Sequence, residues 1–287
     1  MLRIFQSLPG RLLAAALLGG AATAAVAAGG GDDYGYKMKH PSWTFQGING
    51  TYDIEAMRRG YQVYREVCSS CHALDHVAFR HLGDPGAPFY WEEFPNPNDN
   101  PYAKAVAADW TVEDIDSDTG DVIEREAIPA DEFPEIYPNQ AAARAANGGA
   151  YPPDLSVITA ARAGGVDYVY NLLIAYDYPK PDDVQLTPGL YWNPVMDGGK
   201  IAMKAPLVEG LVEYPPVEME VGGETQTVQV AATVDQMSKD VTHFLAWAAD
   251  PKLEERKRAG LAVMAYLSLL TLLFYLSYKR IWRDVDH

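Results

Sequence analysis

The pattern of apolar and polar positions predicts a helix directly after Asp53. Large apolar side chains recur there every three or four residues, which places them on one face of a helix. These positions are Ile54, Met57, Tyr61, Tyr64 and Val67. Asp53 is a suitable N-cap, because its carboxylate can accept a hydrogen bond from a free backbone N–H in the first turn. The sequence therefore predicts a helix over residues 54–67 that buries one face.

A second amphipathic helix is predicted far downstream. Residues 233–236 read Thr-Val-Asp-Gln, a capping-box pattern in which the first and fourth side chains can exchange hydrogen bonds with the backbone. Apolar residues follow at helical spacing, and Pro251 is expected to end the helix. These apolar residues are Val241, Phe244, Leu245 and Ala248. We expect this helix to pack on the first one, with Gly60 allowing the two backbones to approach closely.

The remaining elements are shorter and are separated by loops. Helices are predicted for residues 165–176 and 139–146, and alternating residues on either side of Gly222 and Gly223 predict a short hairpin. Proline and glycine are dense in the segments 85–101, 148–153, 179–194 and 206–223. Such segments form loops more readily than sheet. The sequence therefore predicts a mainly α fold with long loops and insertions around a small helical core.

Residues 1–28 have the pattern of a secretory signal. They contain two arginines and no acidic residue, then an apolar run from Leu12 to Leu18, then small residues up to Ala28. Cleavage is expected near Ala27 or Ala28. An uncleaved membrane anchor is the alternative, although the apolar run is rich in Ala and Gly and is weaker than a usual membrane span.

A second apolar segment, residues 259–278, is long enough to cross a membrane. At about 1.5 Å per residue, a helix of this length spans about 30 Å, the thickness of one bilayer core. The alternative is a buried core helix, but no charged residue interrupts the segment. Basic residues flank it on both sides, so the exported N-terminus has to decide the orientation. We therefore expect residues 29–258 on the outer side of the membrane and residues 279–287 in the cytoplasm or, in a mitochondrion, in the matrix.

The only two cysteines of the chain, Cys68 and Cys71, lie at the end of the first predicted helix and are followed by His72. In this C-x-x-C-H spacing, two thiols can form thioethers to the vinyl groups of a haem while the histidine binds the iron. A zinc site would need further clustered ligands, which the six histidines do not provide. A redox dithiol or a disulfide is another alternative, but neither explains the adjacent histidine. The motif therefore indicates covalently attached haem c.

The chain is strongly acidic, with a formal net charge of −16 at pH 7. Residues 109–135 contain eleven Asp or Glu and a single basic residue, Arg125. Such a run is typical of a solvated loop. It is also typical of a surface that attracts a basic partner, which would make association faster and sensitive to salt. We expect no nucleic-acid partner.

The proximal histidine leaves the opposite side of the iron open for a second ligand, which is Met or His in electron carriers. Outside the signal, the apolar C-terminal segment and the proximal side, the remaining methionines are Met196, Met203, Met219 and Met237, and Met203 lies in a loop bounded by Gly and Pro that can fold over the opposite haem face. The spacing favours Met203 and leaves Met196 as the alternative. His76 follows the motif by one helical turn, so it would remain on the proximal side. His81 and His243 are expected to be hydrogen-bonded structural or surface residues.

Beyond the haem motif, the chain resembles the cytochrome c1 family, the haem c subunits of ubiquinol-cytochrome c oxidoreductase. The resemblance begins at residues 58–72, which include the haem motif, and continues in order along most of the chain. The further matching blocks are residues 77–82, 142–150, 152–156, 161–169, 201–203 and 244–251, followed by the C-terminal span. A lone C-x-x-C-H indicates only haem c, whereas this ordered series of blocks is specific.

The resemblance implies a cytochrome c-like haem domain with one covalently bound haem c. Cys68 and Cys71 would carry the thioethers, His72 would be the proximal iron ligand and Met203 the distal ligand. A soft, neutral thioether on the distal side stabilises the reduced iron, so the resemblance also implies a high reduction potential.

Three further residues match positions that contact the cofactor in this family. Arg162 and Tyr168 match contacts to a haem propionate, where a guanidinium can pair with the carboxylate. Pro153 matches a proline on the proximal face, whose carbonyl can accept a hydrogen bond from the proximal imidazole and orient it. The resemblance therefore implies a cofactor held by both faces and by its polar edge.

The function implied by the resemblance is electron transfer. The chain would take single electrons from the Rieske iron-sulfur subunit and pass them to a soluble or tethered cytochrome c, beside cytochrome b in a dimeric complex. It would not be an enzyme on its own. The simple Ala-rich N-terminus favours the bacterial inner membrane, with the haem domain on the periplasmic side. Some bacterial relatives close an inserted loop with an extra cysteine pair, which this chain lacks, so packing alone must hold that loop.

Two other functions fit a membrane-anchored haem c protein. With an open sixth position at the iron, the chain would be a haem sensor or enzyme that binds small molecules. With other partners, it would be an anchored haem c subunit of a different oxidoreductase. Binding of carbon monoxide to the reduced form separates the first of these from a Met-ligated carrier, and co-purification with a haem b subunit separates the second.

Overall fold

The computed structural model describes residues 34–221 and 224–284, so the predicted signal segment lies outside the described residues. The helices are α1 (Ile54–Glu66), α2 (Pro101–Ala108), α3 (Gln140–Ala146), α4 (Ile158–Ala161), α5 (Gly165–Ile174), α6 (Val234–Ala249) and α7 (Leu253–Ile281). Short 3-10 turns cover Cys68–Ser70, Phe79–Gly83, Ala175–Asp177 and Asp197–Gly199. The strands form three antiparallel pairs: β1 (Thr111–Ile115) with β2 (Val122–Glu126), β3 (Tyr191–Trp192) with β4 (Lys200–Ile201), and β5 (Val217–Val221) with β6 (Glu224–Val228). The predicted mainly α fold is therefore confirmed.

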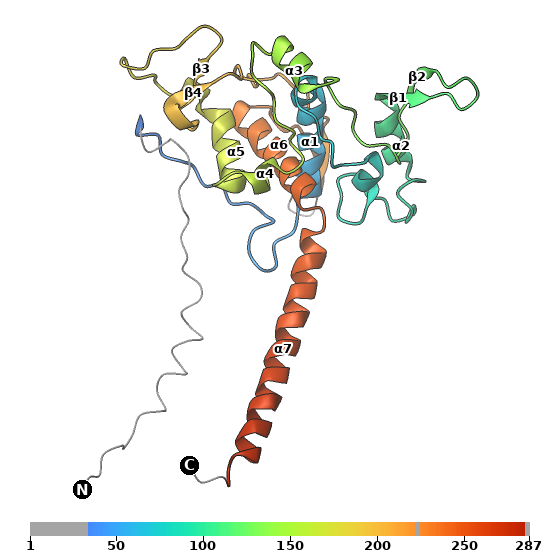
Figure 1. Ribbon diagram of the computed structural model, residues 1–287, viewed down its shortest axis with the longest axis vertical. Coiled ribbons are helices and arrows are strands. Elements are labelled where there is room, and N and C mark those ends of the chain that lie inside the picture. The colour runs from blue at the N-terminus through green and yellow to red at the C-terminus, as the bar shows by residue number, and fades with distance from the viewer. Residues whose placement is uncertain (1–33, 222–223, 285–287) are drawn as a thin grey trace.

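Helix α6 is the centre of the folded head. It contacts α1 as well as α4 and α5, and Figure 1 shows these helices gathered together while α7 extends away from them. The four predicted apolar positions of α6 are all buried, and so are its polar residues Ser238, Asp240 and Thr242. Because other elements surround this helix, its burial is wider than the single face expected from its apolar pattern.

Helix α1 forms where the cap and the apolar spacing predicted it. The Asp53 carboxylate accepts a hydrogen bond from the backbone N–H of Ala56 at 3.0 Å. Met57, Tyr61 and Tyr64 are buried in the main hydrophobic core. The helix ends at Glu66, and the following 3-10 turn begins at the first cysteine of the haem motif.

The capping box of α6 is only half formed. The Thr233 hydroxyl accepts a hydrogen bond from the backbone N–H of Gln236 at 3.1 Å, as the sequence predicted. The Gln236 side chain does not return to the Thr233 backbone and donates instead to both carboxylate oxygens of Asp240, at 3.1 Å each. A buried acid one turn further along the helix therefore competes for the amide that would complete the box.

Gly60 brings the backbones of α1 and α6 into contact. A Cβ at this position would lie 2.0 Å from the carbonyl oxygen of Asp240 and 2.7 Å from the Cβ of Phe244. Both of these atoms belong to the interior of a packed helix, so neither can move away cheaply. The predicted close approach at Gly60 is therefore confirmed.

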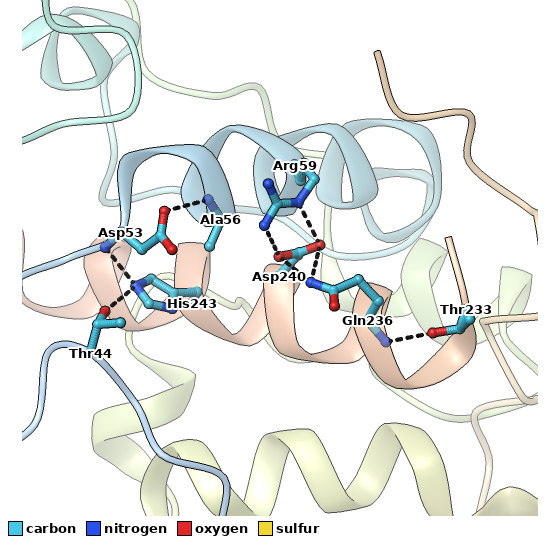
Figure 2. Close-up of polar contacts among 8 residues, drawn as sticks. All are labelled: Thr44, Asp53, Ala56, Arg59, Thr233, Gln236, Asp240 and His243. Atoms are coloured by element: carbon cyan, nitrogen blue, oxygen red, sulfur yellow. Dashed lines mark hydrogen bonds and ion pairs between the residues drawn. The ribbon is translucent and has the colours of Figure 1, made fainter. Parts of the chain in front are cut away.

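A buried ion pair joins the same two helices beside Gly60. The Arg59 guanidinium donates two hydrogen bonds to the two Asp240 oxygens, at 3.0 Å each, and Figure 2 shows this paired geometry together with Gln236. The Asp240 side chain is 1% exposed and that of Arg59 is 13% exposed. Burial raises the pKa of Asp240, while the hydrogen bonds and charge of Arg59 act in the opposite direction. The pair therefore places two opposite charges inside the core, beside the point where the two helices approach most closely.

His243 is a structural residue, as the sequence predicted. Its Nε2 accepts a hydrogen bond from the backbone N–H of Asp53 at 3.0 Å and lies 3.4 Å from the Thr44 hydroxyl (Figure 2). The rings of Trp43, Phe45 and Tyr52 surround it. Since Nε2 acts as an acceptor, the folded state requires a neutral ring, and burial lowers the pKa of His243 to about 4.

This neutral histidine predicts an acid-sensitive step in stability. An unfolded histidine has a pKa of about 6.5, so between this pH and about 4 only the unfolded state gains the proton. The contribution of neutral His243 to the free energy of unfolding is therefore complete above about pH 6.5. It decreases as the pH falls from there to the folded pKa, by up to about 3 kcal/mol in total. Thermal unfolding of the full chain between pH 7 and 4 should show this loss, and it should be absent in His243→Gln. Equal pH dependence in both proteins would contradict the assignment.

Several elements were not predicted, among them the short helix α4, the β3–β4 pair, helix α2 and the β1–β2 hairpin. Helix α2 begins at Pro101, in a segment that the sequence analysis assigned to a loop, and Asn100 caps it by accepting hydrogen bonds from the next two free N–H groups. The acidic segment contains the β1–β2 hairpin, whose turn is held by the Asp116 carboxylate. A proline at the first helical position and an Asx-type turn are both known local signals, but neither segment has enough apolar residues to show a clear period.

The predicted elements near the C-terminus are present. β5 and β6 pair antiparallel, with Val221 opposite Glu224, where a hairpin was expected. α7 is the one helix among the described residues that is long and apolar enough to cross a membrane, with a mean hydropathy of 2.0 over its best window and none of that window buried. It begins at Leu253, before the predicted apolar segment.

The first turns of α7 are attached to the head. Lys257 donates hydrogen bonds to the carbonyl oxygens of Phe45 and Gly50 at 2.6 and 3.0 Å. The Glu254 carboxylate accepts a hydrogen bond from the backbone N–H of Tyr52 at 3.0 Å. These contacts fix the direction in which α7 leaves the domain.

Candidate functional site

The haem motif forms a single tight turn at the end of α1. The carbonyl oxygen of Cys68 accepts hydrogen bonds from the backbone N–H groups of both Cys71 and His72, at 3.1 and 2.9 Å. The two intervening residues bond back to the last turn of the helix: the Ser69 hydroxyl donates to the Arg65 carbonyl at 2.6 Å and the Ser70 hydroxyl to the Val67 carbonyl at 2.9 Å. These bonds hold the two thiols and the imidazole on one compact piece of backbone.

The two cysteines are half-buried free thiols. Burial raises the pKa of Cys68 to about 12, and the neighbouring Cys71 acts in the same direction. A protonated, buried thiol is unlike the low-pKa thiolate that redox dithiols require. The described residues also contain no group of three or more His, Cys, Asp or Glu side chains placed to hold a metal ion. The local chemistry therefore resembles neither a redox dithiol nor a zinc site.

The His72 imidazole is held in one orientation by Pro153. Its Nδ1 lies 2.7 Å from the Pro153 carbonyl oxygen. A carbonyl can only accept a hydrogen bond, so Nδ1 carries the proton and Nε2 keeps its lone pair. Burial lowers the pKa of His72, against the opposing effects of the Pro153 hydrogen bond and the Asp154 charge, so the ring is neutral. A neutral imidazole with a free Nε2 is the state that ligates iron.

The backbone after His72 is bonded to the segment that contains Pro153. The Leu155 N–H donates to the Ala73 carbonyl at 3.0 Å, and the His76 N–H donates to the Ser156 hydroxyl at 3.0 Å. From the other side, the Tyr64 hydroxyl donates to the His72 carbonyl at 3.2 Å. Residues from α1, from the motif and from the 153–156 segment together fix the position of the imidazole.

The expected helical turn from His72 to His76 is wrong. Residues 72–74 have no regular secondary structure, and residues 75–76 form a turn. The reason is the pairing with residues 153–156, which takes the backbone N–H and C=O groups that a helix would use. The helical argument against His76 as a second iron ligand therefore fails, although its backbone remains tied to the proximal segment.

A second group of residues predicted to contact the cofactor lies around α5 and the following 3-10 turn. The Tyr176 hydroxyl donates to the Met203 carbonyl at 3.0 Å, and β4 ends two residues before Met203. The Tyr168 hydroxyl donates to the sulfur of Met196 at 3.6 Å. Burial raises the pKa of Tyr168, with the nearby Arg162 charge acting in the opposite direction. The structure therefore places Met203, Tyr168 and Arg162 on connected elements.

The two groups are separate in the described part of the chain. No hydrogen bond or ion pair among the described residues joins Cys68, His72 and Pro153 to Tyr168 and Met203. Arg162 is exposed, and its guanidinium makes no ion pair with another described residue. The polar groups that remain open are therefore the imidazole Nε2 on one side and the thioether of Met203 and the guanidinium of Arg162 on the other.

Four residues that position this site were not singled out from the sequence. They are Tyr64, Asp154, Ser156 and Tyr176. The first three fix the backbone around His72, and the last holds that of Met203. Asp154 and Ser156 carry a signal that can be read locally, because Asp-x-Ser often forms an Asx turn. No sequence signal indicates the roles of Tyr64 and Tyr176, since each acts on a residue outside its own turn of helix.

The donor groups fit haem c by their chemistry. Two free thiols on one turn are what thioether formation needs, and the neutral His72 presents Nε2 with no hydrogen bond to another described residue. Among the described residues no hydrogen bond reaches the Met203 sulfur, whereas the Met196 sulfur is already contacted by Tyr168. This difference favours Met203 over Met196 as a group free to bind a metal.

Comparison with known proteins gives a match over most of the chain. The model of the Cytochrome C1 family matches residues 43–285. This range includes the haem motif, the Pro153 segment, the Met203 loop and the apolar C-terminal helix.

Several curated proteins are similar to the chain. It is 45% identical over 240 residues to "Cytochrome c1-2, heme protein, mitochondrial" of Solanum tuberosum, covering 84% of this chain and 83% of that protein. It is 37% identical over 268 residues to "Cytochrome c1" of Rhodospirillum rubrum, covering 88% and 90%. It is also 39% identical over 260 residues to "Cytochrome b/c1" of Bradyrhizobium diazoefficiens, where the match covers 84% of this chain and only 35% of that protein.

Proposed function

This chain belongs to the cytochrome c1 family, and from that premise we propose that it carries single electrons from the Rieske iron-sulfur protein to a cytochrome c. Family membership makes it a haem c electron-transfer subunit of the bc1 complex, which is not an enzyme by itself. The proposal adds the donor, the acceptor and the residues that hold the cofactor. It rests on the family match together with the geometry around His72.

The proposed cofactor site uses both groups of residues. Cys68 and Cys71 would hold one haem c covalently, and His72 Nε2 and the Met203 sulfur would ligate its iron. The haem supplies a one-electron iron couple whose potential depends on these ligands. Arg162 and Tyr168 would contact a propionate, which would supply the counter-charge for the open guanidinium of Arg162. No bond in a substrate is made or broken.

The observation that carries the proposal is the orientation of His72. The hydrogen bond to Pro153 fixes the tautomer and leaves Nε2 as the only ring nitrogen able to bind a metal. Buried His243 is different, because its Nε2 is already occupied and accepts a hydrogen bond from the Asp53 N–H. The Nε2 of His72 has no hydrogen bond to a described residue and follows two free thiols, which supports a role for His72 as an iron ligand.

The proposed membrane arrangement uses α7 as a single span. Residues 29–258 form the haem domain on the periplasmic side of the bacterial inner membrane, residues 259–278 cross it, and residues 279–287 lie in the cytoplasm after removal of the signal, residues 1–28. The attachment of Lys257 and Glu254 to the head supports a fixed distance between the haem domain and the membrane surface. A fixed distance suits a subunit that exchanges electrons with cytochrome b and Rieske partners within a dimeric complex.

The proposed acceptor surface is the acidic hairpin β1–β2. Its exposed acids are Glu113, Asp118, Asp121, Glu124 and Glu126. Glu113 and Glu124 lie directly opposite each other in the pair, a placement of like charges that lowers the stability of a hairpin. Figure 1 shows the hairpin projecting at one edge of the head, beyond α2. The hairpin thus keeps exposed acids although they lower its stability. This supports a role for these acids in attracting a basic cytochrome c.

Amide replacements in this hairpin should slow the reaction with the acceptor at low salt. The variant Glu113→Gln, Asp118→Asn, Glu124→Gln and Glu126→Gln removes four exposed charges and keeps Asp114, Asp116 and Asp131, which hold Arg125 and the turn. Electrostatic steering predicts a second-order rate lower by about tenfold at low ionic strength and a smaller difference at high salt. Stopped-flow oxidation of the reduced protein by a basic cytochrome c measures this rate.

The matched control removes four exposed acids elsewhere. Glu92, Glu93, Asp182 and Asp183 are exposed, and their side chains make no hydrogen bond or ion pair with described residues. The quadruple amide variant at these positions has the same net charge as the hairpin variant. Equal rates in the two variants would show that only net charge matters and would contradict a docking role of the hairpin.

The donor side of the proposal is tested in the membrane complex. The chain, isolated from its membranes with a mild detergent, should co-purify with a haem b subunit, and its haem c should be reduced by quinol in single-turnover experiments. Removal of the Rieske subunit should abolish this reduction while ascorbate still reduces the haem. Quinol reduction that persists without the Rieske subunit would contradict the proposed donor.

A further inference from the structure

Asp154 follows the proline that orients His72, and its carboxylate accepts two backbone hydrogen bonds at once. Oδ2 accepts from the N–H of Asp75 at 2.8 Å, and Oδ1 accepts from the N–H of Ser156 at 2.8 Å. The first bond crosses to the segment that leaves the haem motif. The second closes a local turn in the proline segment. One side chain therefore fixes the shape of residues 153–156 and their position against residues 72–76.

Other bonds keep the two segments together when Asp154 is changed. Leu155 still donates to the Ala73 carbonyl, and the fully buried Ser156 still accepts from the His76 N–H. Loss of the Asp154 carboxylate would remove the turn that it closes beside Pro153 and its bond to Asp75, and would free the Pro153 carbonyl to shift against the His72 ring. This would loosen that contact without separating the segments.

We propose that Asp154 is a positioning residue that sets the 2.7 Å contact between the Pro153 carbonyl and His72 Nδ1, and through it the electron donation of His72 to the iron. This inference rests on the proposed function, because it concerns the same iron ligand. A strong hydrogen bond from Nδ1 makes an imidazole a more basic ligand, which favours oxidised iron. Weakening the bond therefore raises the reduction potential.

Loss of the negative charge of Asp154 would also raise the reduction potential, so this effect must be separated from the effect of positioning His72. Removing any nearby negative charge disfavours the oxidised, more positive iron and raises the potential. Asp75 provides the matched control. The pKa of Asp75 is raised, mainly by burial and next by the negative charge of Asp154, so the two carboxylates lie near each other. The buried Oδ1 of Asp75 has no hydrogen-bond partner among the described residues, so Asp75→Asn removes a charge and keeps the Asp154 bonds.

The test uses the full chain with haem attached, in detergent. Asparagine has one acceptor oxygen in place of two, so Asp154→Asn loses one of the two bonds, and Asp154→Ala loses both. The reduction potential is measured by redox titration. The exchange of the His72 Nδ1 proton with solvent is measured by NMR of the reduced protein labelled with 15N-histidine. The second readout reports the hydrogen bond itself and does not respond to a distant charge.

We expect the potential to rise in the order Asp75→Asn, Asp154→Asn, Asp154→Ala, with proton exchange unchanged in the first and faster by about tenfold or more in the last. Equal potentials in Asp75→Asn and Asp154→Asn, with unchanged proton exchange, would overturn the positioning role even if the alanine variant does not fold. A wild-type chain without covalent haem, or with the haem not bound by His72, would instead refute the proposed function and this role with it.

Discussion

Replacing Met203 by leucine is expected to leave the haem attached and to lower its reduction potential by a substantial part of the roughly 0.8 V range that axial ligands control. The thioethers depend on Cys68 and Cys71 alone, so attachment does not need Met203. Leucine has a similar volume and no donor atom, so the loop can keep its packing while the reduced iron loses its stabilising ligand. A redox titration of the purified variant measures the change.

The matched control is Met196→Leu. Met196 lies in the same irregular region, and its sulfur already accepts a hydrogen bond from Tyr168. Its replacement should change the potential little, and carbon monoxide should bind the reduced Met203→Leu protein but not the reduced Met196→Leu protein. A potential that falls in Met196→Leu and not in Met203→Leu would exchange the two assignments.

Replacing Asp240 by alanine is expected to destabilise the head by about 3–5 kcal/mol, a large part of the stability of an ordinary domain. The change leaves Arg59, whose side chain is only 13% exposed, without its counter-charge. It also frees the Gln236 amide, which donates to both Asp240 oxygens. Thermal unfolding of the full chain, followed by circular dichroism, measures the loss.

The neighbouring residue gives the control for this change. Lys239 pairs with Asp235 on the exposed side of the same helix, at 2.6 Å, with side chains 39% and 50% exposed. Exposed pairs contribute little, so Lys239→Ala should cost less than about 1 kcal/mol. The double change Arg59→Met with Asp240→Leu should recover part of the stability, because an apolar pair leaves no buried charge. A small loss in Asp240→Ala would contradict a charged, buried pair.

The sequence was most informative where several local signals agreed. α1 and α6 each combined a cap residue with helical apolar spacing, α6 also had a proline after its end, and both formed at the expected positions. Gly60 was predicted as a contact point because two amphipathic helices had to pack somewhere, and a glycine allows the closest approach. The apolar C-terminal segment was found for a similar reason, since nothing interrupts its hydropathy.

The sequence was least informative where contacts between distant segments decide the backbone. Residues 72–76 were expected to continue a helix. Leu155 donates a hydrogen bond to this segment, Asp154 and Ser156 accept hydrogen bonds from it, and these bonds hold it in an irregular path followed by a turn. The β1–β2 hairpin was read as an acidic loop because exposed strands show little apolar alternation. The chemistry of Cys68, Cys71 and His72 was recognisable from spacing, whereas Pro153, whose carbonyl orients the His72 ring, lies 81 residues further along the chain.

The central claim is that this chain carries one covalent haem c with His72 and Met203 as axial ligands. A redox-titrated visible spectrum of the full chain, made in a host that matures haem c and repeated under carbon monoxide, tests it most directly. We expect haem that stays with the denatured chain, a single one-electron transition at high potential, and a reduced spectrum that carbon monoxide does not change. Haem that is lost on denaturation, or a low-potential form that binds carbon monoxide readily, would contradict it.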